Sequence, residues 1–188
     1  TALAGPAAAH SILVNPPPIG QDDAAKSGPC GCYFGGGPED PNDDPSPAPC
    51  PGDYPVTTLQ AGTQLKIEWK ETINHDGNFR LAFASTAPEM TSKAATDNAV
   101  VIEIPDTNGT SGATLSQTIT VPSTPCELCT IQLRQFMMGA ANPYYYSCAA
   151  VKIVAADSTS SGTGGAGGGA GGMGQGAASA GGNGAGAS

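Results

Sequence analysis

Basic residues are scarce in this sequence, and their scarcity excludes whole classes of partner. Seven Lys and Arg residues stand against sixteen Asp and Glu, which leaves a formal charge of −9 at pH 7. A nucleic-acid partner is not expected, because phosphate binding requires a basic face. The same balance argues against docking to an anionic lipid surface. No apolar run approaches the roughly 20 residues of a membrane-spanning helix.

The motifs of common hydrolases and nucleotide-binding enzymes are also missing. The sequence has no Gly-x-Ser-x-Gly elbow, no phosphate-cradling loop ahead of a helix and no His-Glu-x-x-His pair. Histidine occurs only twice, as His10 and His75. A hydrolase triad would require one of them as its base, but the sequence shows no evident nucleophile motif to pair with it. The two histidines therefore indicate a different kind of site.

His10 follows three alanines, a small-residue run of the kind that a signal peptidase reads at the end of a secretory leader. We interpret residues 1–9 as the remnant of such a signal peptide, so that cleavage after Ala9 makes His10 the first residue of the mature chain. A histidine in that position offers its α-amine and its ring Nδ1, and His75 adds a third nitrogen. Three neutral nitrogen donors suit Cu(II), and the sequence therefore predicts a copper site.

The chain divides into a foldable middle and two atypical ends. Residues 10–156 have the size of one ordinary domain. Residues 157–188 are almost only Gly, Ala and Ser, which predicts a flexible linker. We expect a secreted, extracellular monomer without a membrane span, with tethering to a cell surface through the linker as a further option.

Strands are the elements that the sequence pattern predicts. Apolar and polar side chains alternate from Val56 onward, so that each strand has one buried and one solvated face. A turn signal, His75-Asp-Gly-Asn, separates two such strands and places His75 at the rim of a hairpin. The other expected strands are 11–14, 100–104, 114–121, 130–136 and 144–154, with one short helical turn in 87–95. This pattern predicts an all-β fold, an immunoglobulin- or fibronectin-III-like antiparallel β-sandwich.

Six cysteines behind a leader-like start indicate an oxidising compartment and up to three disulfides. Three of them lie in residues 20–55, a proline-rich stretch without periodicity, which predicts a long N-terminal loop held by disulfides. The pairing stays open, because six cysteines allow about 15 connectivities. Cys126-x-x-Cys129 also has the spacing of a zinc site, and so in part has Cys30-x-Cys32. Disulfides are favoured over zinc in an exported protein.

Three further residues are candidates for roles around the copper. Tyr145 is expected on the same face of its strand as several apolar residues, so its ring could lie under a metal. Packing within the sheet is an equally good explanation for a tyrosine at this position. Arg80 is close enough in sequence to His75 for its side chain to reach back across the turn toward the copper site. The alternative is that Arg80 is an ordinary surface arginine. Gln135 is a second candidate for a group that orients ligands or holds an oxygen species.

Several phrases of the sequence occur in an order that resembles a known family. They are His10 after the Ala-x-Ala site, Pro16-Pro-Pro with Gly28-Pro-Cys-Gly-Cys32, Glu71-Thr-Ile-Asn-His75-Asp-Gly-Asn-Phe-Arg80, and Tyr144-Tyr-Tyr-Ser-Cys148. Together they resemble the bacterial lytic polysaccharide monooxygenase-like proteins. The Pro-Cys-Gly of the early loop is also similar to that of copper-binding relatives in the same superfamily.

The resemblance implies an immunoglobulin-like sandwich with a surface copper in a histidine brace. By this analogy His10 gives its amine and Nδ1, His75 gives its Nε2, and Tyr145 takes the axial position. The implied reaction is oxidative cleavage of glycosidic bonds at the surface of chitin, cellulose or a similar polysaccharide, with an external electron donor and O2 or H2O2. In the copper-binding relatives the extra ligand can be an Asp. The candidates here are Asp22, Asp23 and Asp76.

The sequence leaves three functions to be compared. The first is a secreted copper-dependent polysaccharide monooxygenase. The second is a non-catalytic histidine-brace protein for copper uptake or storage, because some relatives with the long early loop do not cleave polysaccharide. The third is a metal-free structural or adhesive sandwich.

Overall fold

The structure is a computed structural model, and it describes residues 11–21, 26, 28–32, 49–107, 110–140 and 143–156. These residues belong to a unit that spans Thr1–Asp157. The elements are β1 (Ser11–Asn15), β2 (Val56–Gln60), β3 (Gln64–Glu71), β4 (Gly77–Ala84), the 3-10 turn η1 (Pro88–Met90), α1 (Lys93–Asp97), β5 (Val100–Asp106), β6 (Thr114–Thr120), β7 (Cys126–Met137) and β8 (Tyr144–Val154). The predicted leader remnant, His10 and the linker lie outside the described residues.

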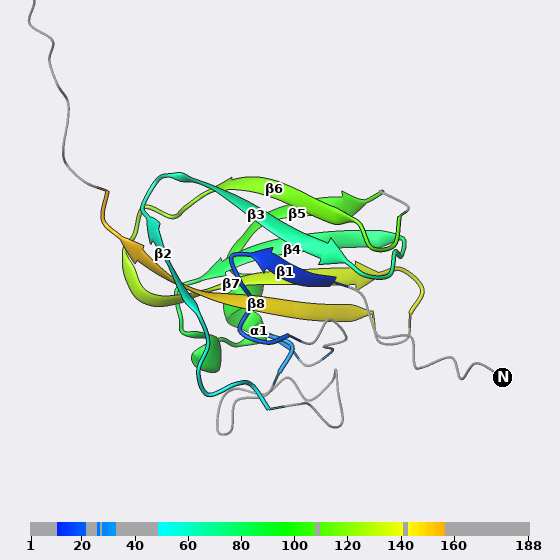
Figure 1. Ribbon diagram of the computed structural model, residues 1–188, viewed down its shortest axis with the longest axis horizontal. Coiled ribbons are helices and arrows are strands. Elements are labelled where there is room, and N and C mark those ends of the chain that lie inside the picture. The colour runs from blue at the N-terminus through cyan, green and yellow to red at the C-terminus, as the bar shows by residue number, and fades with distance from the viewer. Residues whose placement is uncertain are drawn as a thin grey trace, which may run out of the picture. The chain divides into compact units, whose positions relative to one another are not determined.

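Two sheets face each other and form a β-sandwich (Figure 1). One sheet has the strand order β1-β3-β6, and the other has the order β2-β8-β7-β4-β5. The predicted all-β sandwich is confirmed. Among the described strands, β2 and β8 are the one parallel pair.

The predicted hairpin around His75 is wrong in one respect. The strands on either side, β3 and β4, belong to different sheets. Each has an apolar face, and these faces meet across the core instead of pairing side by side. The connection that carries His75 therefore crosses from one sheet to the other at the end of the sandwich.

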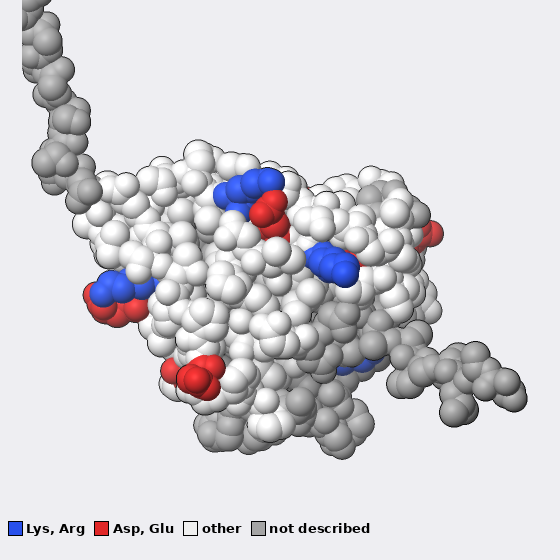
Figure 2. All heavy atoms as spheres, viewed as in Figure 1, with Lys and Arg blue, Asp and Glu red and all other residues white. Residues whose placement is uncertain are grey.

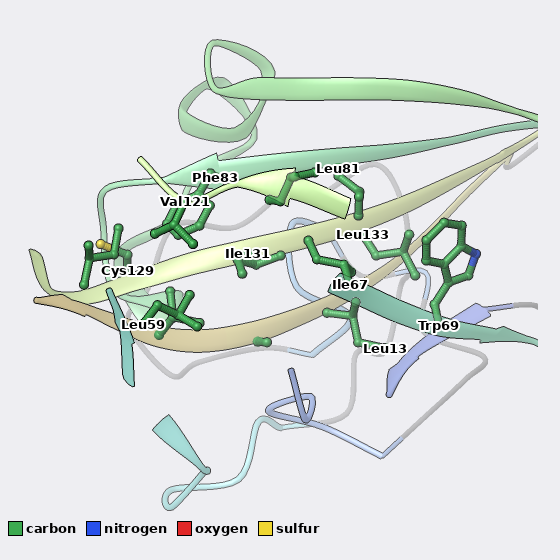
Figure 3. Close-up of a cluster of buried hydrophobic side chains, with 14 of the residues drawn as sticks. Leu13, Leu59, Ile67, Trp69, Leu81, Phe83, Val121, Cys129, Ile131 and Leu133 are labelled. Atoms are coloured by element: carbon green, nitrogen blue, oxygen red, sulfur yellow. The ribbon is translucent and has the colours of Figure 1, made fainter. Parts of the chain in front are cut away.

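Alternating side chains fill the space between the sheets. Along β3, Ile67 and Trp69 face the core while Lys66 and Lys70 face solvent. Figure 3 shows side chains from both sheets meeting in this core, with Trp69 at one end and Cys129 at the other. Each large apolar side chain buried in this way contributes about 1.5–3 kcal/mol to folding.

Three disulfides are present, as predicted. Two of them fasten the early loop, through Cys30–Cys148 to β8 and through Cys32–Cys50 within the loop itself. The third joins Cys126 and Cys129 at the start of β7. All six cysteines lie in the described part of the chain and all are paired, so no thiolate is left for the alternative zinc site.

The short helical turn expected in 87–95 is present as η1 and α1. The side chain of Ser92 caps α1 by accepting a hydrogen bond from the backbone N–H of Ala95 at 3.1 Å. None of the helices in the described residues is long and apolar enough to cross a membrane.

Candidate metal centre

Several strand ends meet where β1 begins. Ser11 of β1 pairs with Glu71 at the end of β3. Gly77, the first residue of β4, pairs with Asp106 of β5 on one side and with Met137 of β7 on the other. Figure 1 shows the ends of β3 and β7 and the starts of β4 and β8 at the right of the sandwich. We call this region the His75 end; it comprises Ser11, Glu71, His75–Gly77, Asp106, Gln135, Met137–Met138 and Tyr145.

The loop from β3 to β4 holds His75 at this end. The backbone N–H of His75 and the side-chain amide of Asn74 both donate to Oε1 of Glu71, each at 3.4 Å. The backbone N–H of Asn74 donates to Oγ of Ser111 at 3.0 Å. His75 is half-buried and Asp76 is exposed. The loop thus closes onto one carboxylate and leaves the imidazole at the edge of the core.

Gly77 is required by the close approach of β4 to β7. A Cβ atom at this position would lie 1.8 Å from the carbonyl oxygen of Phe136. No side chain can be accommodated so close to a backbone oxygen, which explains the glycine of the His-Asp-Gly phrase. A side chain at this position would push the start of β4 away from β7.

A buried polar cluster lies directly behind the loop. Glu71 and Gln135 are completely buried, and Asp106 is 7% exposed. Nε2 of Gln135 donates to Oε1 of Glu71 at 3.1 Å and lies 3.5 Å from Oδ2 of Asp106. Two buried carboxylates are costly unless they accept hydrogen bonds, and the Gln135 amide supplies them. Gln135, which the sequence singled out, is therefore joined through Glu71 to the backbone of His75.

Sequence reasoning did not assign a role to Glu71 or Asp106. Their positions in the strands could have indicated such a role, because every second residue of a strand points to the same face. Glu71 lies on the same face of β3 as the core residues Ile67 and Trp69, and Asp106 lies on the same face of β5 as Ile104. An acidic residue at a core-facing position at the end of a strand indicates a buried polar contact.

Tyr145 belongs to the same end. It is 5% exposed, it packs against Met137, and it pairs with Gln135 across β7 and β8. The ammonium group of Lys26 lies 4.2 Å from the centroid of its ring, which is a cation–π contact. The structure thus brings Tyr145, Gln135 and the His75 loop together.

Arg80 lies elsewhere. It is on the outer face of β4, between two core-facing residues, and its guanidinium donates to Asp97 of α1 and to Oε1 of Gln132 at 2.9 Å. Burial would raise the pKa of Asp97, but hydrogen bonds from Lys93 and Arg80 outweigh it and hold that pKa below its usual value. These contacts give Arg80 a part in fastening α1 to the sheet.

The donor set can be compared with what copper needs. Across the described ranges, no three His, Cys, Asp or Glu side chains come together to hold a metal ion. His10, Asp22 and Asp23 lie outside these ranges. Ser11, which follows His10 in the sequence, is buried and pairs with Glu71, the residue that anchors the His75 loop. His10 directly precedes this strand in the sequence, and imidazole nitrogen is a donor that copper prefers, so the two histidines are donors of the right type for a copper site at the His75 end.

Comparison with known proteins supports the fold. No family model and no curated protein matches the sequence. An AA10 lytic polysaccharide monooxygenase from Streptomyces lividans matches 76% of this chain and 99% of its own, with 18% identity and a TM-score of 0.51. The AA15 lytic polysaccharide monooxygenase from Thermobia domestica in the Cu(I) state matches 77% and 98%, with 14% identity and a TM-score of 0.58. The sandwich is therefore like that of the lytic polysaccharide monooxygenases.

Proposed function

We propose that this protein is an exported, copper-dependent polysaccharide monooxygenase whose metal is held by His10 and His75. The observation that carries the proposal is the pairing of Ser11 with Glu71, whose carboxylate accepts the backbone N–H of His75. This register brings the strand that follows one histidine to the loop that holds the other. The amine and Nδ1 of His10 and the imidazole of His75 would then supply nitrogen donors for the copper.

Bound copper would supply the redox chemistry that oxidises a polysaccharide chain, with H2O2, or O2 and electrons from an external donor, as the co-reactants. The residues of the chain prepare the site for it. Glu71 fixes the loop backbone at His75, and Gln135 holds Glu71 and Asp106 in place. Such outer hydrogen bonds orient metal ligands. Tyr145 is buried at the His75 end next to this cluster, and we propose it as a further residue that would line the copper site.

A polysaccharide is the substrate class that the comparisons suggest. Both neighbours described above are named as polysaccharide monooxygenases. Figure 2 shows that charged side chains are few and scattered on the face viewed, with broad uncharged stretches between them. A surface of this kind suits a neutral, hydroxyl-rich polymer better than a charged one.

Product release from polysaccharides tests the proposed reaction. The protein beginning with His10 is loaded with one equivalent of Cu(II) and incubated with ascorbate and chitin, cellulose or starch. We expect oxidised oligosaccharides from at least one polysaccharide, and none from the His75→Ala variant, which lacks one ligand. Mass spectrometry of the soluble products provides the measurement.

The same experiment separates the competing functions. Copper-loaded protein that releases no oxidised product from any polysaccharide would contradict the enzyme and favour a copper-binding protein for uptake or storage. Protein that takes up no copper at all would favour the metal-free structural sandwich.

A further inference from the structure

Met138 is an exposed thioether at the His75 end. It lies in the turn after β7, and its side chain is 68% exposed. Met137, directly before it, faces inward and packs against Tyr145, so strand alternation turns Met138 outward. The side chain of Met138 therefore contributes little to the core.

The turn that carries Met138 is joined to the His75 loop. The backbone N–H of Met138 donates to the carbonyl oxygen of Asp76 at 2.8 Å, and that of Met137 donates to the carbonyl oxygen of Pro143 at 2.8 Å. Asp76 is the residue after His75. A backbone hydrogen bond thus fixes the thioether-bearing residue next to the histidine-bearing loop.

A second exposed methionine shows that this placement is particular to Met138. Met90 is 65% exposed, almost as much as Met138, but it follows the far end of β4 in the 3-10 turn η1. β4 runs from Gly77 at the His75 end to Ala84, a length of about 23 Å at roughly 3.3 Å per residue. Met90 therefore offers the same chemistry and exposure beyond the end of β4 that is far from His75.

We propose that Met138 is a ligand for the reduced copper ion, sharing Cu(I) with the imidazole of His75. Thioether sulfur is a soft donor that selects Cu(I), and imidazole binds both copper oxidation states. Methionine is also flexible enough to reach a neighbouring ion. The inference rests on the copper site proposed above, to which it adds a donor that acts in one oxidation state.

A competition titration tests this assignment. The protein beginning with His10 is titrated without oxygen against a chromophoric Cu(I) chelator, and separately with Cu(II). Met138→Leu keeps the side-chain volume and removes the sulfur. We expect it to weaken Cu(I) binding by about tenfold or more, since a soft donor is lost, and to change Cu(II) affinity less than twofold. Met90→Leu, the matched control, should leave both affinities unchanged.

The outcomes separate this inference from the proposed function. Met138→Leu with the Cu(I) affinity of the parent protein, an equal loss in Met90→Leu, or a parent protein that binds no Cu(I), would each overturn the role of Met138. The His75→Ala variant titrated with Cu(II) tests the proposed copper site itself. Unchanged Cu(II) affinity there would contradict the proposed function, while a Met138-dependent Cu(I) affinity would still support the thioether ligand.

Discussion

Glu71 is the residue on which the His75 end depends most directly. Its buried carboxylate accepts hydrogen bonds from the side chain of Gln135 and from the backbone of His75. We expect Glu71→Ala to lower the free energy of unfolding by about 2 kcal/mol, because the N–H groups of Gln135 and His75 lose their acceptor. Urea unfolding measures this change, and the NMR signals of His75 should shift with it.

Glu68 on the same strand provides the matched control. It faces solvent and pairs with Lys66 on the surface, and exposed pairs of this kind contribute about 0–1 kcal/mol. If Glu71→Ala were no more destabilising than Glu68→Ala, the buried cluster would not hold the loop as described.

The place of His75 between two strands could be predicted from the sequence, whereas the contacts of the residues around it could not. The turn phrase predicted that His75 would lie between two strands, because Asp, Gly and Asn favour turns; His75 does lie between β3 and β4, although Gly77 and Asn78 already belong to β4. The contacts of Glu71 and Arg80 could not be predicted from their spacing to His75. Arg80 is five positions from His75 in the sequence, but strand alternation puts it on the outer face of β4.

At the scale of the element, α1 is fastened to the sheet through one carboxylate. Asp97 accepts hydrogen bonds from Arg80, which is almost fully buried, and from Lys93. We expect Asp97→Asn to lower the free energy of unfolding by about 2 kcal/mol, because a buried guanidinium loses its charged partner. Thermal or urea unfolding at pH 7 gives the measurement.

The effect of this substitution should depend on pH in a defined direction. The pKa of Asp97 is lower in the folded protein than its usual value. The stabilisation of the folded protein by the Asp97 carboxylate is therefore fully present above the pKa of Asp97 in the unfolded chain, about 3.9. It is lost as the pH falls through the lower pKa of Asp97 in the folded protein. The difference between the parent protein and Asp97→Asn should shrink on acidification. A difference that stays constant from pH 7 to pH 2 would contradict the contact.

The strands themselves were largely predictable, whereas their partners were not. Alternation identified β3 and β6, because each has one buried face; most positions of β4 and β8 are buried on both faces. The same pattern is produced by a hairpin and by two strands that face each other across a core. The turn after β3 could therefore not reveal that the chain changes sheets there.

At the scale of the whole molecule, the disulfides differ in what they contribute. Cys30–Cys148 joins residues 118 positions apart, and Cys126–Cys129 joins residues 3 positions apart. The chain-entropy estimate gives about 5 kcal/mol for the long closure and about 1.5 kcal/mol for the short one. Replacing both cysteines of each pair by Ala should reproduce this order in urea unfolding. A larger loss from the short pair would contradict it.

The presence of disulfides could be predicted from cysteine number, and their pairing could not. The pairing depends on β8 lying beneath the early loop, where Ile19 donates its backbone N–H to the carbonyl oxygen of Cys148 at 2.8 Å. This is a contact between residues far apart in the sequence, and no spacing rule reports it.

The central claim is that a free chain start at His10 and the ring of His75 hold one copper ion. A Cu(II) titration of two forms tests it most directly, one beginning with His10 and one that keeps residues 1–9. We predict one tightly bound copper per chain, with nitrogen ligation in its EPR spectrum, only in the first form, because a peptide nitrogen cannot replace the amine as a neutral donor. Equal copper affinity of the two forms would contradict the account.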